Sequence, residues 1–147
     1  MDCLTFLLLI FSIVFVSCSP CKNILSTDVL NIEEIQRCID DDPSSLLDTD
    51  DLIPFGLKVI FEFDHPILAI SFANSLPDKG FRFEKRYLKG VANLMLGDLS
   101  LGFEYLDVML NRGCKRFCEE AVCVHSLAKL SLGLNISQIS SSIYQLG

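Results

Sequence analysis

Three cysteines and a histidine lie close together near the C-terminal end of the sequence, and their types could bind zinc or form disulfides. No well-known zinc module has the spacing of these residues, which are Cys114, Cys118, Cys123 and His125. Cys118 and Cys123 also lie five positions apart on a predicted helix, which would point their side chains away from each other. We therefore predict no metal site here and expect disulfides or buried thiols instead.

The sequence contains seven cysteines, two of them within the first 18 residues. The five that follow are the disulfide candidates Cys21, Cys38, Cys114, Cys118 and Cys123. Close pairs form disulfides in an oxidising compartment, and an odd count leaves one thiol over. Two pairings suit the spacing: one joins Cys21 to Cys38, and the other joins Cys114 to Cys118 or Cys123. The sequence leaves the connectivity open.

Nothing in the sequence indicates catalysis. The histidines, His65 and His125, each lie in or beside an apolar helical run, where a structural role is the default. Nucleophilic catalysis also needs an orienting group and an oxyanion donor, and neither is indicated. The acidic pairs at 33–34 and 119–120 are adjacent in sequence, so they point to different sides of a helix. There is no glycine-rich phosphate loop, and we predict neither catalytic residues nor a cofactor.

The first 18 residues indicate targeting. Residues 4–16 are apolar apart from Thr5 and Ser12, a stretch too short to span a membrane comfortably. We predict that residues 1–18 are a signal peptide, cut before Ser19, although Asp2 stands where a basic residue is usual. Two alternatives stay open: an uncleaved signal anchor, and a lipoprotein signal in which Cys18 carries lipid. Each places the domain outside the cytosol.

The remaining chain, residues 21–147, is predicted to be one domain, because its length suffices for a core of its own. Asn135, in the triplet Asn135-Ile136-Ser137, is a candidate glycosylation acceptor if the source is eukaryotic.

The charge pattern argues against nucleic acid and anionic membranes as partners. The formal net charge is −7, and acidic residues gather at Asp40, Asp41, Asp42, Asp48, Asp50 and Asp51. A nucleic-acid-binding protein needs a basic face to neutralise phosphates. The basic residues are scattered, apart from one short cluster at Lys79, Arg82, Lys85, Arg86 and Lys89. The acidic run lacks an EF-hand ligand pattern and is predicted to be a solvated loop.

The apolar spacing predicts an all-α fold, because no stretch sustains the two-residue alternation of a strand. We expect a helix after the capping residues Ser26-Thr27-Asp28, ending at Asp42-Pro43. Later helices are expected over 52–63, from Asp64 to Leu76, over 83–96, from the Gly97-Asp98 corner to Leu110, over 115–132, and from Asn135 onward.

The sequence also resembles itself after a shift of 34 to 36 residues. A shift of 34 pairs Gly56 with Gly90 and Phe61 with Met95, and a shift of 36 pairs Val91 with Leu127. The apolar positions of each first helix then form one stripe that we expect to be buried. This pattern predicts a short array of stacked helix-turn-helix units; the alternative is an irregular helical bundle.

The segment Lys89-Gly90-Val91-Ala92-Asn93-Leu94-Met95-Leu96-Gly97-Asp98, followed by Gly102, Leu106 and Met109, resembles a degenerate tetratricopeptide repeat. The resemblance implies that Gly56, Gly90 and Gly102 lie where paired helices pack closely. The ankyrin repeat is the alternative, since Asn31-Ile32-Glu33-Glu34-Ile35 to Asp42-Pro43 and Met109 to Cys114 are similar to parts of an ankyrin unit.

These observations predict a secreted or membrane-associated, non-catalytic interaction module that holds a peptide or protein partner in a helical-repeat groove. The alternative is a small secreted helical carrier of an apolar ligand, suggested by the eleven phenylalanines. The sequence does not identify the partner.

Overall fold

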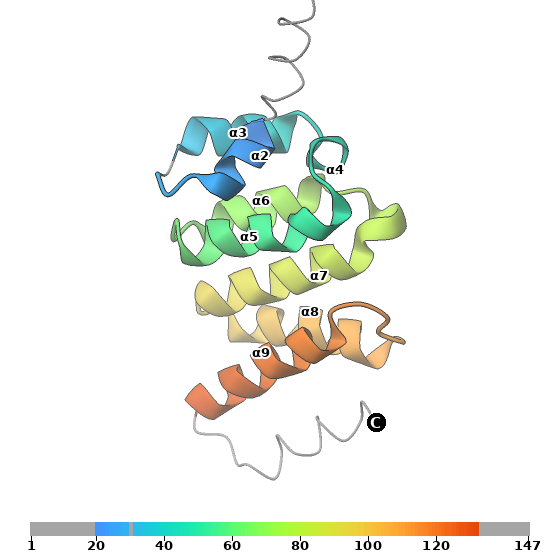
Figure 1. The fold of residues 1–147 in the computed structure, drawn as a ribbon. Coiled ribbons are helices and arrows are strands. Elements are labelled where there is room, and N and C mark those ends of the chain that lie inside the picture. Colours follow the sequence, from blue (N-terminus) through green and yellow to red (C-terminus); the bar gives the residue numbers. More distant parts are fainter. Residues whose placement is uncertain (1–19, 30, 133–147) are drawn as a thin grey trace, which may run out of the picture.

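Every regular element is helical in the part of the chain that the computed structural model describes, residues 20–29 and 31–132 (Figure 1). The elements are α2 (Pro20–Ser26), α3 (Ile32–Asp40), α4 (Pro43–Leu46), the 3-10 helix η1 (Thr49–Asp51), α5 (Leu52–Phe61), α6 (Pro66–Ser75), α7 (Asp78–Met95), α8 (Leu99–Asn111) and α9 (Cys118–Ser131). The predicted all-α fold is confirmed for these residues. The predicted signal segment 1–18, the acceptor Asn135 and the last predicted helix lie outside them.

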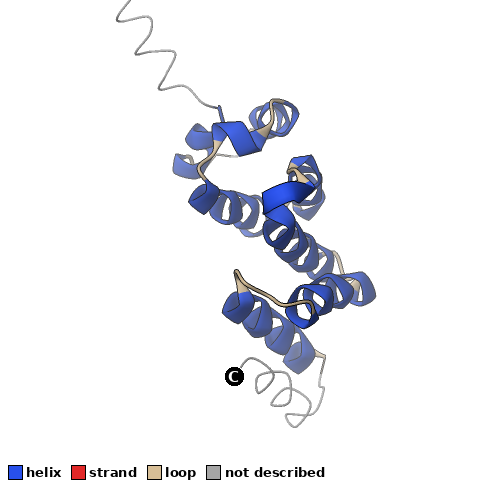
Figure 2. Cartoon of the chain, turned by 90° about the vertical axis from the view of Figure 1, so that its right-hand side faces the viewer, coloured by secondary structure: helices blue, strands red, loops and turns tan. Residues whose placement is uncertain are grey.

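The helices are stacked in sequence order, from α2 and α3 at one end to α8 and α9 at the other (Figures 1 and 2). In this stack α5 packs on α6, α6 on α7, α7 on α8 and α8 on α9. A single cluster of buried apolar side chains runs through these interfaces, from Cys21 and Ile24 to Met109 and Ala121. The stacked helix packing is therefore as predicted, while the repeat interpretation stays a prediction.

The N-terminal end differs from the prediction in its capping. Ser26, Thr27 and Asp28 do not cap α3; Ser26 is instead the last residue of an unpredicted helix, α2. The cap is Asn31, whose Oδ1 accepts hydrogen bonds from the backbone N–H groups of Glu33 and Glu34 at 3.1 and 3.2 Å. An asparagine side chain satisfies the same free N–H groups of the first turn as a serine or aspartate would.

The acidic segment after α3 is more ordered than the predicted loop, because it contains α4 and η1. Asp42 adopts a left-handed conformation with φ of 59° and caps α4, accepting a hydrogen bond from the Ser44 N–H at 3.2 Å. Pro43 follows at the first position of the helix, where its missing N–H has no intrahelical partner to lose.

The α5–α6 pair forms largely where it was expected. Phe55 and Phe72 pack ring against ring between the two helices, with centroids 4.6 Å apart. The predicted cap Asp64 is wrong, since His65 precedes the first helical residue, Pro66, and its side chain makes no capping hydrogen bond. Asp64 instead takes a positive φ of 54°, as part of the turn that reverses the chain.

Helix α7 departs from helical backbone geometry over residues 79–81, directly after its first residue, and is regular from there to Met95. Gly80 has a φ of 96° at this interruption, which falls in the gap between the predicted helices that end at Leu76 and begin at residue 83. The predicted corner at Gly97 and Asp98 is confirmed. Gly97 has a φ of 81°, which favours glycine, and Asp98 Oδ1 accepts a hydrogen bond from the Leu101 N–H at 3.1 Å.

Helix α9 begins at Cys118, three residues later than the predicted Lys115. The segment between α8 and α9 is held as a loop by a disulfide from Cys114 to Cys118 and by the left-handed Phe117, with φ of 58°. Apolar periodicity alone does not reveal such a constraint, because the loop residues continue the pattern of the helix.

Candidate functional sites

The three glycines singled out from the sequence lie at close helix contacts. A Cβ atom added to Gly56 of α5 would overlap the side chain of Leu88 in α7. One added to Gly90 would come within 2.8 Å of the Leu106 side chain in α8. One added to Gly102 would lie 2.7 Å from Leu94 Cγ and 3.0 Å from the Leu94 backbone nitrogen. The α7–α8 contact therefore has no room for a side chain at Gly102 unless the backbones separate.

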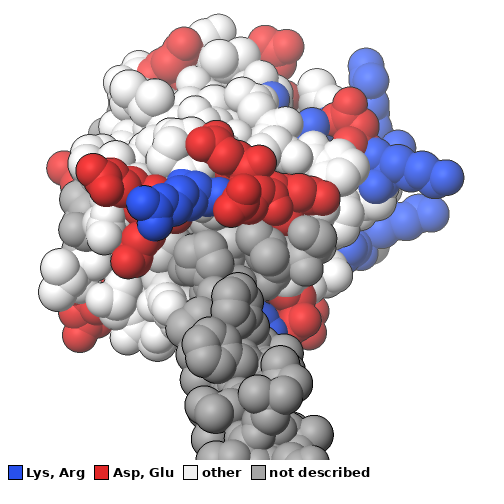
Figure 3. All heavy atoms as spheres, turned by 90° about the horizontal axis from the view of Figure 1, so that it is seen from above, with Lys and Arg blue, Asp and Glu red and all other residues white. Residues whose placement is uncertain are grey.

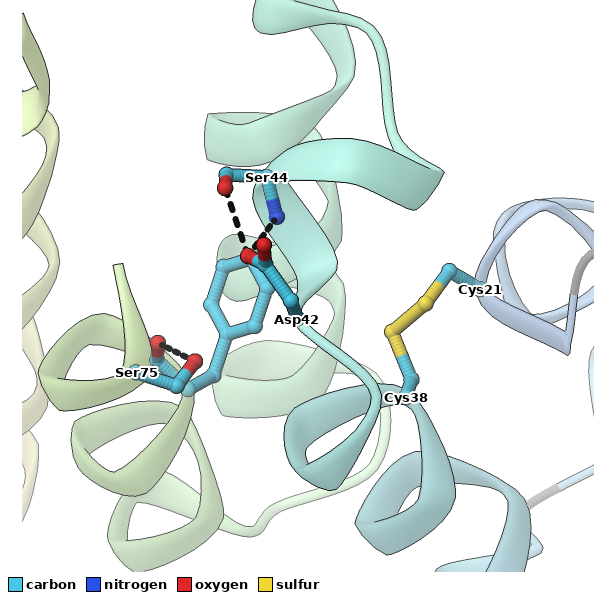
Figure 4. Close-up of a disulfide and its surroundings, with 6 residues drawn as sticks. Cys21, Cys38, Asp42, Ser44 and Ser75 are labelled. Carbon is cyan, nitrogen blue, oxygen red and sulfur yellow. Dashed lines mark hydrogen bonds between the residues drawn. A yellow bond between two sulfur atoms is a disulfide. The ribbon is translucent and has the colours of Figure 1, made fainter. Parts of the chain in front are cut away.

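The structure pairs Cys21 with Cys38, which joins α2 to α3 (Figure 4). Both cysteines are fully buried, and 17 positions separate them along the chain. The bond thus ties the first described helix into the core, in the arrangement that the spacing suggested.

The second disulfide joins Cys114 to Cys118, which resolves the alternative left open by the sequence. Cys123 is an exposed free cysteine on α9. The sulfur atoms of Cys114 and Cys118 are thus bonded to each other, while His125 faces α8. Two disulfides suit a protein of an oxidising compartment.

The Cys114–Cys118 loop holds a charged partner for a buried carboxylate. Glu84 of α7 is 0% exposed, and its Oε1 lies 2.9 Å from Arg116 Nη2. The Arg116 guanidinium also lies over the ring of Phe117, and Phe117 stacks on Tyr87 of α7 with centroids 6.1 Å apart. A buried charge is costly without a partner, and Arg116 supplies an ionic partner for Glu84, although neither carboxylate oxygen accepts a hydrogen bond.

His125 connects α9 to α8. It is 3% exposed, and its Nε2 lies 2.9 Å from Asp107 Oδ1, while its ring meets the edge of Phe103 at a centroid distance of 5.0 Å. Burial lowers the pKa of His125, although the nearby Asp107 carboxylate opposes that shift. Burial thus favours the neutral form of His125, whose Nε2–H donates to the Asp107 carboxylate.

An apolar groove of about 320 Å³ runs between α7 and α9 and is completed by the end of α5 and the start of α8. The residues that line it are Phe61, Val91, Leu94, Met95, Leu99, Val124, Leu127, Ala128 and Ser131. Phe61, Met95 and Leu127 remain 56%, 50% and 59% exposed. A continuous apolar surface of this kind is a usual mark of a binding site.

This groove corrects one prediction from the sequence. The predicted buried stripe includes Val91 and its equivalent Leu127, and the self-similarity also pairs Phe61 with Met95 beside it. Val91 is buried, but the other three side chains are exposed along the groove. The sequence identifies these residues as apolar positions of the repeat. It does not show that the stack of helices leaves part of the stripe uncovered at α9.

Two kinds of feature are absent from the described residues. Among them, no cluster of three or more cysteine, histidine or acidic side chains is placed to hold a metal ion. No helix in the same part of the chain is both long and apolar enough to span a membrane.

The fold and surfaces define an all-α stack of helices, stapled by two disulfides and carrying an open apolar groove. Comparisons with family models, curated proteins and solved structures gave no match.

Proposed function

We propose that this protein is a non-catalytic interaction module of the secretory pathway, and that it binds an amphipathic helix of a protein partner in the groove between α7 and α9. The observation that carries the proposal is the exposure of Phe61, Met95 and Leu127 along one continuous apolar surface. Covering these side chains removes apolar area from water, which contributes roughly 25 cal/mol per Å².

A helix suits this groove better than an extended strand. The walls are the helices α7 and α9, and helix-lined grooves receive the apolar face of a partner helix through positions spaced three and four apart. An extended peptide that binds by strand addition needs a free sheet edge, and the described residues form no sheet. The two disulfides support the secretory assignment, since they are stable in oxidising compartments.

The groove itself also favours a second candidate function, carriage of a small apolar ligand. Its volume of about 320 Å³ falls at the lower end of the range for small-molecule sites. However, Phe61, Met95 and Leu127 are half-exposed, so the groove is open, whereas a carrier encloses most of its ligand. Native mass spectrometry of protein from its own source tests this function, and a stoichiometric co-purified lipid would favour it.

The test of the interaction proposal is capture by matched variants. The chain is immobilised as wild type, Leu127→Glu and Ile67→Glu, and each is exposed to extract from the native source. Ile67, on α6, is 66% exposed and does not line the groove, so its variant carries the same new charge elsewhere. Unfolding midpoints verify that all three chains fold equally well.

We expect a protein that is retained by wild type and Ile67→Glu but lost from Leu127→Glu. The purified partner should then bind wild type directly, with a dissociation constant at least tenfold higher for Leu127→Glu. Equal capture of every protein by wild type and Leu127→Glu would overturn the proposal.

A further inference from the structure

A second groove, of about 390 Å³, lies on the basic part of α7 against α8. Its lining residues are Asp78, Arg82, Lys85, Arg86, Lys89 and Tyr105. The four basic residues fall at intervals of three, one and three positions, so they share one face of the helix. The groove brings together four cationic side chains and one carboxylate, in a chain whose net charge is −7.

This basic groove is separate from the apolar groove. Residues turn by about 100° along an α-helix, so positions 82 to 89 point away from positions 91, 94 and 95, which line the apolar groove. Figure 3 shows lysine and arginine side chains gathered at the right-hand edge, the side on which α7 begins in Figure 1. Acidic side chains lie across other parts of the same view.

The cations of the groove are held close to protein atoms. The Lys85 side chain is only 14% exposed, and its Nζ lies 2.6 Å from Asp78 Oδ1. The Nζ of Lys89 lies 5.4 Å from the centroid of the Tyr105 ring. Burial lowers the pKa of Lys89, and the adjacent Lys85 charge lowers it further. One carboxylate therefore faces four cations, and the positive charge is only partly neutralised.

The interactions of Asp78 show how the basic groove binds a carboxylate. Its own side chain is 92% exposed, yet its pKa is lowered, first by the hydrogen bond from Lys85 and then by the charges of Lys85, Lys89 and Arg86. The exposed Asp78 carboxylate can be displaced by another carboxylate at small cost, because the incoming group keeps the largely buried Lys85 charge paired.

We propose that the basic groove binds a short acidic segment of a protein partner, which displaces Asp78 from Lys85 and places its carboxylates on Lys85, Arg86 and Lys89. Residues 82 and 89 are about 10 Å apart along the helix, which matches about three residues of an extended peptide. A long polyanion would extend past this face and be repelled by the rest of a chain whose net charge is −7. A short acidic segment makes the contacts without that repulsion.

The experiment measures binding of a fluorescein-labelled hexaglutamate peptide to the full chain at low and at physiological salt. Wild type should bind saturably, with an affinity that falls as salt rises because salt screens charge pairs. Lys85→Gln/Arg86→Gln should weaken binding at least tenfold. The control Lys22→Gln/Lys115→Gln, which removes the same charge outside the groove, should change it by less than twofold.

A second pair of variants tests the displacement of Asp78. Asp78→Asn should bind the peptide more tightly, by about threefold or more, because the competing carboxylate is gone. Glu104→Gln removes one negative charge from an exposed position on α8 outside this groove, so it should not tighten peptide binding. Equal affinities for wild type, both double variants and Asp78→Asn would overturn the proposal. So would tighter binding of a short DNA duplex through the same residues.

Discussion

Arg116 reaches from the Cys114–Cys118 loop to Glu84 in the core, where its Nη2 lies 2.9 Å from a carboxylate that is fully buried. The loop and α7 are thus joined by a charge pair of which only the arginine side is accessible to water. Removing one partner of such a pair leaves an uncompensated charge in the core.

Arg116→Ala should lower the free energy of unfolding by about 2–4 kcal/mol, somewhat less than the cost of breaking a fully enclosed pair. The reduction follows from the 40% exposure of the Arg116 side chain, which lets water replace part of the interaction. Urea unfolding of both proteins measures the change. The double variant Glu84→Gln/Arg116→Ala should be more stable than Arg116→Ala alone, since no charge remains buried. A loss below about 0.5 kcal/mol in Arg116→Ala would show that Glu84 does not depend on this partner.

Gly102→Leu should destabilise the protein by roughly 1–3 kcal/mol or more, as overpacking does. The reason is the contact that an added Cβ would make with the Leu94 backbone nitrogen at 3.0 Å, because backbone cannot rotate away as a side chain can. Glu104→Gln, two residues away and exposed, should change stability by less than about 0.5 kcal/mol. Thermal unfolding midpoints provide the comparison. Leucine is the better helix former, so a higher midpoint in Gly102→Leu would mean that α7 and α8 do not touch here.

The contacts at Gly90 and Gly102 show which parts of the fold can be predicted from the sequence. The small residues, the Gly97-Asp98 corner and the apolar positions of α7 and α8 are local signals, so the helix pair around Gly90 and Gly102 could be predicted. The first residue of α9 could not be predicted, because it depends on the disulfide before it, and that disulfide depends on which cysteines meet in space. The groove was missed for a related reason: apolar periodicity identifies one face of a helix but not whether another helix covers it.

Stability should fall as the pH drops from about 6.5 through the native pKa of His125. Burial lowers that pKa, so below the usual value the unfolded chain takes up the proton more readily than the folded chain. Well above pH 6.5 the histidine is neutral in both states and contributes no pH dependence. Urea midpoints of wild type and His125→Gln between pH 7.5 and 5.5 isolate this effect, because most carboxylates titrate at lower pH. Parallel curves for the two proteins would mean that His125 protonates equally in both states.

The predicted mature chain, lacking residues 1–18, should react with a thiol reagent at one cysteine under denaturing, non-reducing conditions. That cysteine is Cys123, because the other four are paired. Reduction should raise the count to five. Replacing Cys21 and Cys38 together by serine should lower the free energy of unfolding by about 3 kcal/mol. This is the stabilisation expected from a disulfide between cysteines 17 positions apart. Five reactive thiols before reduction, in protein from its native compartment, would contradict both pairings.

The most direct test of the central claim places a photo-crosslinking amino acid at Leu127 of the full chain in its native source. Leu127 lines the apolar groove and is 59% exposed, so it should contact whatever fills the groove. The same amino acid at Ile67 serves as the control. We predict that crosslinking from position 127, and not from position 67, attaches a second protein through a peptide with apolar residues spaced three and four apart. Crosslinks from position 127 only to residues 133–147 of the same chain, or only to lipid, would contradict the claim that this groove receives a protein partner.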